Sequence, residues 1–104
     1  MESVMSEERN EITRLINLYI DGAGKGDADK LNEAFHESSR WFGTMGGTDY
    51  DMDKKGFVDL MVSEPGDTGN LVAHIADIQI DGTAAVATVK EEGFWGAYSF
   101  TDYF

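Results

Sequence analysis

Apolar residues recur every three or four positions along the first third of the chain, a spacing that predicts helices packed on a core. The first helix is expected over residues 7–23, with Ser6 as its cap and the glycines at positions 22, 24 and 26 ending it. Its apolar face holds Ile12, Leu15, Ile16, Tyr19, Ile20 and Ala23. A second helix is expected over residues 28–36, capped by Asp27, and a third over residues 54–62.

The later part of the chain changes to an alternating pattern, which predicts strands. From Asn70 onwards one strand face is expected to hold Val72, His74, Ala76, Ile78 and Ile80. Asp81-Gly82 predicts a tight turn with two positive φ angles. Strands are expected to follow over residues 84–91 and 94–104, and a short strand to precede them over residues 40–42. Residues 43–53, rich in Gly and Asp, are expected to form a loop or a loose hairpin. Helices followed by antiparallel strands make an α+β pattern.

Length and charge narrow the class of protein. The 104 residues fit one domain, 1–104, and the net charge of −12 lacks the basic footprint that nucleic-acid binding needs. An anionic membrane surface would repel such a chain as well, so neither partner is expected. The chain has no cysteine, no apolar signal region at its start and no long apolar run. Cytoplasmic localisation is therefore the expectation.

Several short motifs, taken in their order, point to a family. They are Leu18-Tyr19-Ile20-Asp21-Gly22, Gly26-Asp27-Ala28-Asp29, Ala34-Phe35-His36, Ile80-Asp81-Gly82-Thr83-Ala84-Ala85-Val86-Ala87 and Thr101-Asp102-Tyr103-Phe104. Over nearly the whole chain, this order resembles nuclear transport factor 2-like domains, and in particular the branch named "putative lumazine-binding", close to the SnoaL-like proteins.

The resemblance implies a cone-shaped, cystatin-like α+β fold. N-terminal helices would pack on a curved, mostly antiparallel sheet and leave a ligand cavity at the open end. The superfamily includes homodimers, enzymes such as isomerases, dehydratases and cyclases, and proteins that only bind ligands. Relatives continue beyond the Asp-Tyr-Phe strand with one more strand inside the sheet. The chain is accordingly expected to lack that final strand and to be a homodimer rather than a stable monomer.

Three residues are candidates for acid–base chemistry. His36 follows the second helix, His74 lies among apolar strand residues, and a histidine pKa lies near neutrality. Asp102 shares a strand face with aromatic residues, where burial would raise the pKa of its carboxyl. In each case a structural role is the alternative: a helix end for His36, the core or an interface for His74, and a strand end for Asp102. No metal site is expected, because the chain has no spaced ligand motif, and no cofactor is expected.

Aromatic residues predict the walls of a ligand pocket, since their rings offer flat apolar area and Tyr and Trp add a polar tip. The expected ligand-binding residues are Tyr19, Trp41, Phe42, His74, Tyr98 and Asp102. Trp95 is a further candidate for a pocket wall. Because it has the opposite strand phase from Tyr98, a dimer contact on the sheet face is the alternative. The favoured function is binding of a small planar or hydrophobic molecule. The alternatives are a small SnoaL-like enzyme with His or Asp as general acid or base, and a dimeric interaction module.

Overall fold

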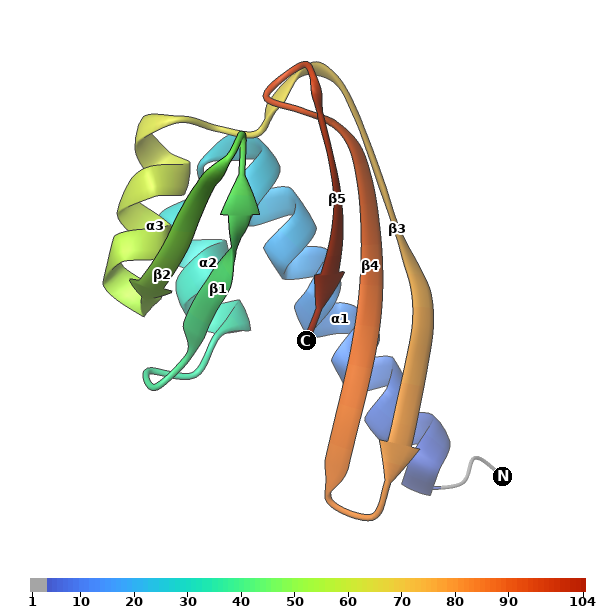
Figure 1. Ribbon diagram of the computed structural model, residues 1–104. Coiled ribbons are helices and arrows are strands. Elements are labelled where there is room, and N and C mark those ends of the chain that lie inside the picture. The colour runs from blue at the N-terminus through green and yellow to red at the C-terminus, as the bar shows by residue number, and fades with distance from the viewer. Residues whose placement is uncertain (1–3) are drawn as a thin grey trace.

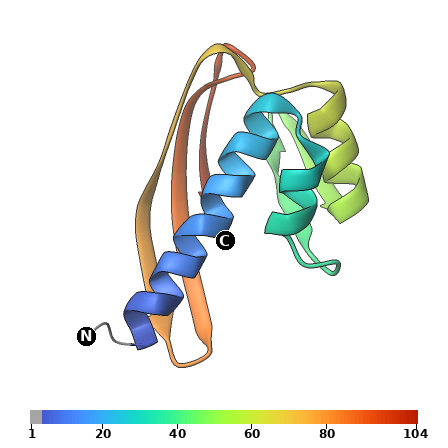
Figure 2. The ribbon, with the colours of Figure 1, turned by 180° about the vertical axis from the view of Figure 1, so that it is seen from behind.

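The computed structural model describes residues 4–104, which form helices packed against two antiparallel sheets (Figures 1 and 2). The α+β class is therefore confirmed. The elements in chain order are α1 (Val4–Lys25), α2 (Ala28–Ala34), β1 (Arg40–Met45), β2 (Thr48–Asp53), α3 (Lys54–Ser63), β3 (Asp67–Asp81), β4 (Ala84–Phe94) and β5 (Tyr98–Tyr103). Within the described residues, no helix is both long and apolar enough to cross a membrane.

Helix α1 begins before the predicted start and runs through two of the three glycines that were expected to end it. Ser6 consequently lies inside the helix and is not its cap. A Cβ atom at Gly22 would lie 2.8 Å from Cγ of Leu31, so this glycine lets α2 approach α1 closely. Gly26, with φ +69°, is the residue that ends the helix. Glycine at position 22 is thus a packing residue, a role that the sequence pattern alone does not distinguish from a helix stop.

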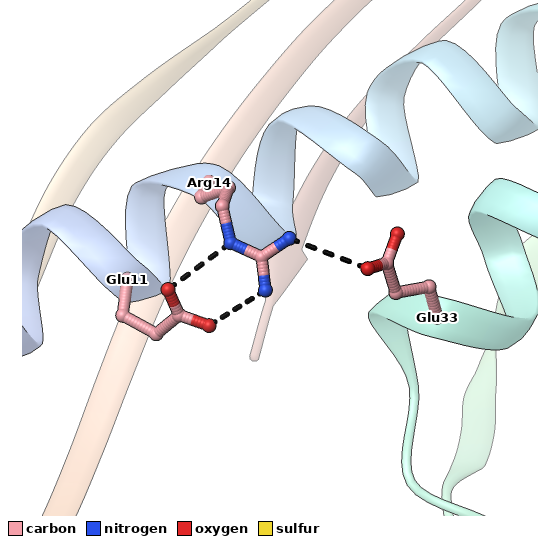
Figure 3. Close-up of polar contacts among 3 residues, drawn as sticks. All are labelled: Glu11, Arg14 and Glu33. Carbon is pink, nitrogen blue, oxygen red and sulfur yellow. Dashed lines mark hydrogen bonds and ion pairs between the residues drawn. The ribbon is translucent and has the colours of Figure 1, made fainter.

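Helices α1 and α2 are held together by apolar and ionic contacts. Leu31 is fully buried, and the Asp27 side chain caps α2 as predicted by accepting a hydrogen bond from the Lys30 amide at 3.3 Å. On the exposed side, the Arg14 guanidinium pairs with Glu11 at 2.7 Å and with Glu33 of α2 at 3.5 Å (Figure 3). These pairs are solvent-exposed, so the buried apolar contact accounts for most of the stabilisation.

The larger sheet has the order β3-β4-β5, and α1 crosses its inner face (Figure 2). Two clusters of buried residues form the hydrophobic core. One gathers around the helices and the end of β4; its fully or nearly buried members are Tyr19, Ala23, Leu31, Phe57, Val58, Met61 and Phe94. The other lies between α1 and the β3–β4 hairpin; its members are Ile16, Ile78, Ala87 and Val89.

A β-bulge in β3 overturns the expected common face of its alternating residues. Ile75 pairs with Val89 and Asp77 pairs with Thr88, so one extra residue, Ala76, interrupts the register. The extra residue reverses the side-chain phase along the strand. Ile78 therefore faces the core, while His74 and Val72 are exposed on the outer face.

The second sheet is the β1–β2 hairpin. Residues 43–53, expected to form a loop or a loose hairpin, therefore belong to a hairpin. Its turn is Gly46-Gly47, both at positive φ. Within residues 4–104, no strand pairing joins β1 to β5. The β3–β4 turn also differs from expectation: its loop is Gly82-Thr83, and of these two residues only Gly82 has positive φ, the pattern of a type II′ turn.

Candidate functional site

The α1 helix and strands β4 and β5 bring one phenol and two carboxyl groups together in the interior. The Tyr19 hydroxyl lies 2.8 Å from Oε1 of Glu91 and 2.9 Å from Oδ2 of Asp102. Glu91 is 3% exposed and Tyr19 is 6% exposed. One hydroxyl proton cannot be donated to both carboxyl groups, so the arrangement is fully satisfied when one of the acids is itself protonated.

The electrostatics indicate that Glu91 carries this proton. Burial raises the pKa of Glu91 to about 9, and the neighbouring Asp102 carboxyl contributes in the same direction by its hydrogen bond and its like charge. The hydrogen bond from Tyr19 opposes this shift in the pKa of Glu91. Burial, together with the two adjacent acids, also raises the pKa of the Tyr19 hydroxyl well above its usual value. At neutral pH the cluster therefore consists of a phenol, a carboxylic acid and the Asp102 carboxyl.

Aromatic rings pack closely around this cluster. Tyr19 makes an edge contact with Phe104 at 5.0 Å and with Phe35 at 5.6 Å, and Trp41 stacks on Phe57 at 4.3 Å. Phe104 is held by backbone hydrogen bonds of 2.8 and 3.1 Å with Ala87. These rings pack against the Tyr19 side of the cluster, where Tyr19 and Glu91 are buried, while Phe104 is 37% exposed and Asp102 is partly buried.

A groove of about 480 Å³ opens at the end of the molecule where the turn of the β1–β2 hairpin approaches the β4–β5 turn. Its walls come from three parts of the chain: Met45 and Tyr50 in the hairpin, Leu60, Glu64 and Pro65 at the end of α3, and Trp95 and Tyr98 beside the β4–β5 turn. Its volume lies within the range of small-molecule sites, roughly 300–1,000 Å³. The walls are mostly apolar and include three large rings.

Trp95, which lines this groove, has a strained backbone conformation. Its φ of +51° lies in the left-handed region, which costs a bulky residue about 1–3 kcal/mol. Two hydrogen bonds hold the conformation: the Trp95 amide donates to the Gly66 carbonyl at 2.7 Å, and the indole Nε1–H donates to the Glu64 carbonyl at 2.6 Å. The position of the indole is therefore fixed both through the backbone and through the ring itself.

The predicted site residues are not all brought together. Tyr19 and Asp102 meet in the carboxyl cluster, Tyr98 lines the groove, and Trp41 packs in the aromatic interior. Phe42 is 74% exposed on the hairpin, away from these rings.

The two histidines lie apart from both features. His36 is exposed, and its Nδ1 accepts a hydrogen bond from the Ser38 amide at 3.0 Å. His74 is exposed on the outer sheet face and not on the face of Ile78, because the bulge at Ala76 reverses the side-chain phase between them. In the described part of the chain, no group of three or more acidic, histidine or cysteine side chains could hold a metal ion.

Sequence reasoning missed Glu91 and most of the groove. Glu91 follows Ala87 and Val89 in the buried phase of β4, a signal that was present in the alternation. The groove residues Tyr50 and Glu64 gave no such signal, because they come from elements whose mutual approach depends on the tertiary fold.

Comparison with known proteins identifies the family. The family model described as "putative lumazine-binding" matches residues 7–104. The chain belongs to this family. No match is found among curated proteins.

Solved structures place this "putative lumazine-binding" chain in the nuclear transport factor 2-like fold. An NTF2-like protein of unknown function from Methylobacillus flagellatus KT is 30% identical, with a TM-score of 0.82 over 99% of this chain and 80% of that one. One from Shewanella baltica OS155 is 26% identical, with a TM-score of 0.84 over 99% and 83%. One from Silicibacter pomeroyi DSS-3 is 19% identical, with a TM-score of 0.84 over 97% and 83%. The predicted fold family is confirmed.

Proposed function

We propose that the protein binds a small planar or hydrophobic molecule in the groove formed by the β1–β2 hairpin, the end of α3 and the β4–β5 turn. The observation that carries this proposal is the convergence of Tyr50, Trp95 and Tyr98 on one hollow of about 480 Å³. Ligand sites are typically concave, mostly apolar and furnished with a few polar groups. The family description, "putative lumazine-binding", agrees with a flat, small-molecule ligand.

The fixed position of Trp95 supports binding in this groove. Backbone strain is concentrated at ligand clamps more often than elsewhere, because the surrounding structure must hold the strained residue in place. Here the hydrogen bonds to Gly66 and Glu64 hold Trp95 before any ligand arrives. A ligand that stacks on a fixed ring loses less free energy to ordering than one that must also order the side chain.

Calorimetric titration with lumazine and with indole, two planar probes, tests this function. Tyr98→Ala is expected to weaken binding of these probes about tenfold or more, because it removes one ring wall of the groove. Phe42→Ala is the control: it removes a 74% exposed ring from the β1–β2 hairpin, outside the groove, and binding should be unchanged. If neither these planar probes nor any other small molecule tried binds the groove, and none co-purifies in native mass spectrometry, the proposal is overturned.

A proton-transfer enzyme is the second candidate function, and the Tyr19–Glu91–Asp102 cluster favours it. Glu91 holds a proton at neutral pH, so it could donate one to a molecule that displaced the Phe104 ring. The same titrations on Asp102→Asn separate the candidates. A ligand of the groove should bind this variant as tightly as it binds the wild type, whereas loss of lumazine binding in this variant would place the ligand at the cluster.

We further propose that the protein is a homodimer associating through the outer face of the β3-β4-β5 sheet. That face carries exposed Val72 and Val86 as well as Tyr103, which are 63%, 50% and 75% exposed. Burying such side chains would favour association. Sedimentation velocity should show a dimer of the 11.5 kDa chain, and Tyr103→Ser should shift it toward monomer. A folded wild-type monomer at the highest concentration would contradict this proposal.

A further inference from the structure

Three aromatic residues and no basic side chain line the groove. Its walls contain Tyr50, Trp95 and Tyr98, none of its lining residues is Lys, Arg or His, and its one acidic residue is Glu64. The face of a tyrosine or indole ring carries partial negative charge. An organic cation on such a face gains electrostatic attraction in addition to the burial of its apolar surface, whereas a neutral molecule gains only the burial.

The indole of Trp95 cannot recognise a ligand by donating a hydrogen bond. An indole has one polar hydrogen, and here it is donated to the Glu64 carbonyl at 2.6 Å. The ring consequently has no donor left for a ligand. What the ring offers in the groove is its π surface, which the hydrogen bonds to Gly66 and Glu64 hold in a fixed position.

The charge of the whole molecule acts in the same direction. With 20 acidic and 8 basic residues, the net charge is −12, and the summed field attracts cations and repels anions at low ionic strength. No positive side chain in the groove wall opposes this field locally. The global charge and the chemistry of the wall are therefore complementary to the same kind of ligand.

We propose that the groove binds a small alkylammonium ion, a tertiary or quaternary amine with an apolar body. This inference rests on the proposed function, because it concerns the same groove, and it adds the sign of the ligand's charge. Contacts to the cation come from the faces of Trp95, Tyr98 and Tyr50, and Glu64 adds negative charge at the rim.

The test compares choline with 3,3-dimethyl-1-butanol, a molecule of the same shape in which carbon replaces the charged nitrogen. Both are titrated at low ionic strength and followed by the NMR signal of the Trp95 indole N–H. Choline is expected to bind about tenfold more tightly than the neutral analogue. Tyr98→Leu keeps apolar area but removes a π face, so it should reduce this preference several-fold; Tyr50→Leu is the second variant should the first not fold.

Each outcome bears on one of the two proposals. Equal affinity for choline and its neutral analogue would overturn the cation inference and leave the groove a binding site. Binding of lumazine or indole with no binding of choline would have the same meaning. A preference for choline that survives both Tyr→Leu variants would show that the cation lies elsewhere, which also overturns the inference. Failure of all four probes would overturn the proposed function itself.

Discussion

Glu91→Gln is expected to make the protein more stable than the wild type at pH 8 and to flatten the pH dependence of its stability. The folded-state pKa of Glu91 is about 9, whereas the carboxyl titrates near 4.5 when exposed. Between these values the unfolded chain binds fewer protons at this position than the folded chain. Wild-type stability should therefore fall as the pH rises through this window, at up to about 1 kcal/mol per pH unit, and level off above it.

Urea unfolding at pH 5, 6, 7 and 8 measures this effect. Glutamine loses no proton, yet it can still accept a hydrogen bond from Tyr19 and donate one to Asp102, as the protonated acid does. The difference between Glu91→Gln and the wild type should grow with pH to roughly 2 kcal/mol or more at pH 8. Glu92→Gln is the control: it removes one negative charge as Glu91→Gln does, but from an exposed position on the opposite sheet face. Parallel profiles for wild type and Glu91→Gln would refute a protonated Glu91.

Gly93→Ala is expected to destabilise the protein strongly, and more than Gly82→Ala, a substitution of a second glycine with positive φ. Gly93 has φ +75°, and a Cβ atom there would overlap the Asn70 carbonyl oxygen and lie 2.9 Å from its carbonyl carbon. The obstacle is backbone of the neighbouring strand, which cannot move aside as a flexible side chain can. We expect a loss of roughly 3 kcal/mol or more in the free energy of unfolding.

Gly82→Ala is the matched control for this substitution. Gly82 has a similar φ of +60°, but no heavy atom lies within 4 Å of the position that an added Cβ atom would occupy. Its cost should be limited to the backbone conformation, about 1–2 kcal/mol. Denaturant unfolding of both variants separates conformational strain from steric overlap. Equal losses would show that the approach of β3 to Gly93 does not restrict this position.

The fold could be predicted largely because local patterns and the family motifs agreed. Helices α2 and α3 begin where Asp27 and Asp53 accept hydrogen bonds from the first-turn amides, an interaction confined to neighbouring residues. The bulge at Ala76 could not be predicted in this way. Alternation continues through it in the sequence, and only the pairing with β4 shows that one residue is extra.

The site was predictable only in part, for a related reason. Tyr19 and Asp102 were recognised singly as polar groups among apolar neighbours, but their meeting depends on α1 crossing the sheet next to β5. Glu91, whose pKa is raised by burial, continues the buried phase of Ala87 and Val89, but its charged neighbours Lys90 and Glu92 make it resemble a surface glutamate. Local patterns assign a residue to a face; they do not say which other chain segment will approach it.

The division of the strands into two sheets has a mechanical consequence for the groove. Met45 and Tyr50 belong to one sheet, and Trp95 and Tyr98 flank the turn of the other, with no strand pairing between the two in residues 4–104. The hairpin is instead attached through side chains, including the stack of Trp41 on Phe57 of α3. Sliding of packed rings meets less resistance than breaking a strand ladder. We therefore expect the two walls to tilt relative to each other more easily than paired strands would, so that a bound molecule sets their separation.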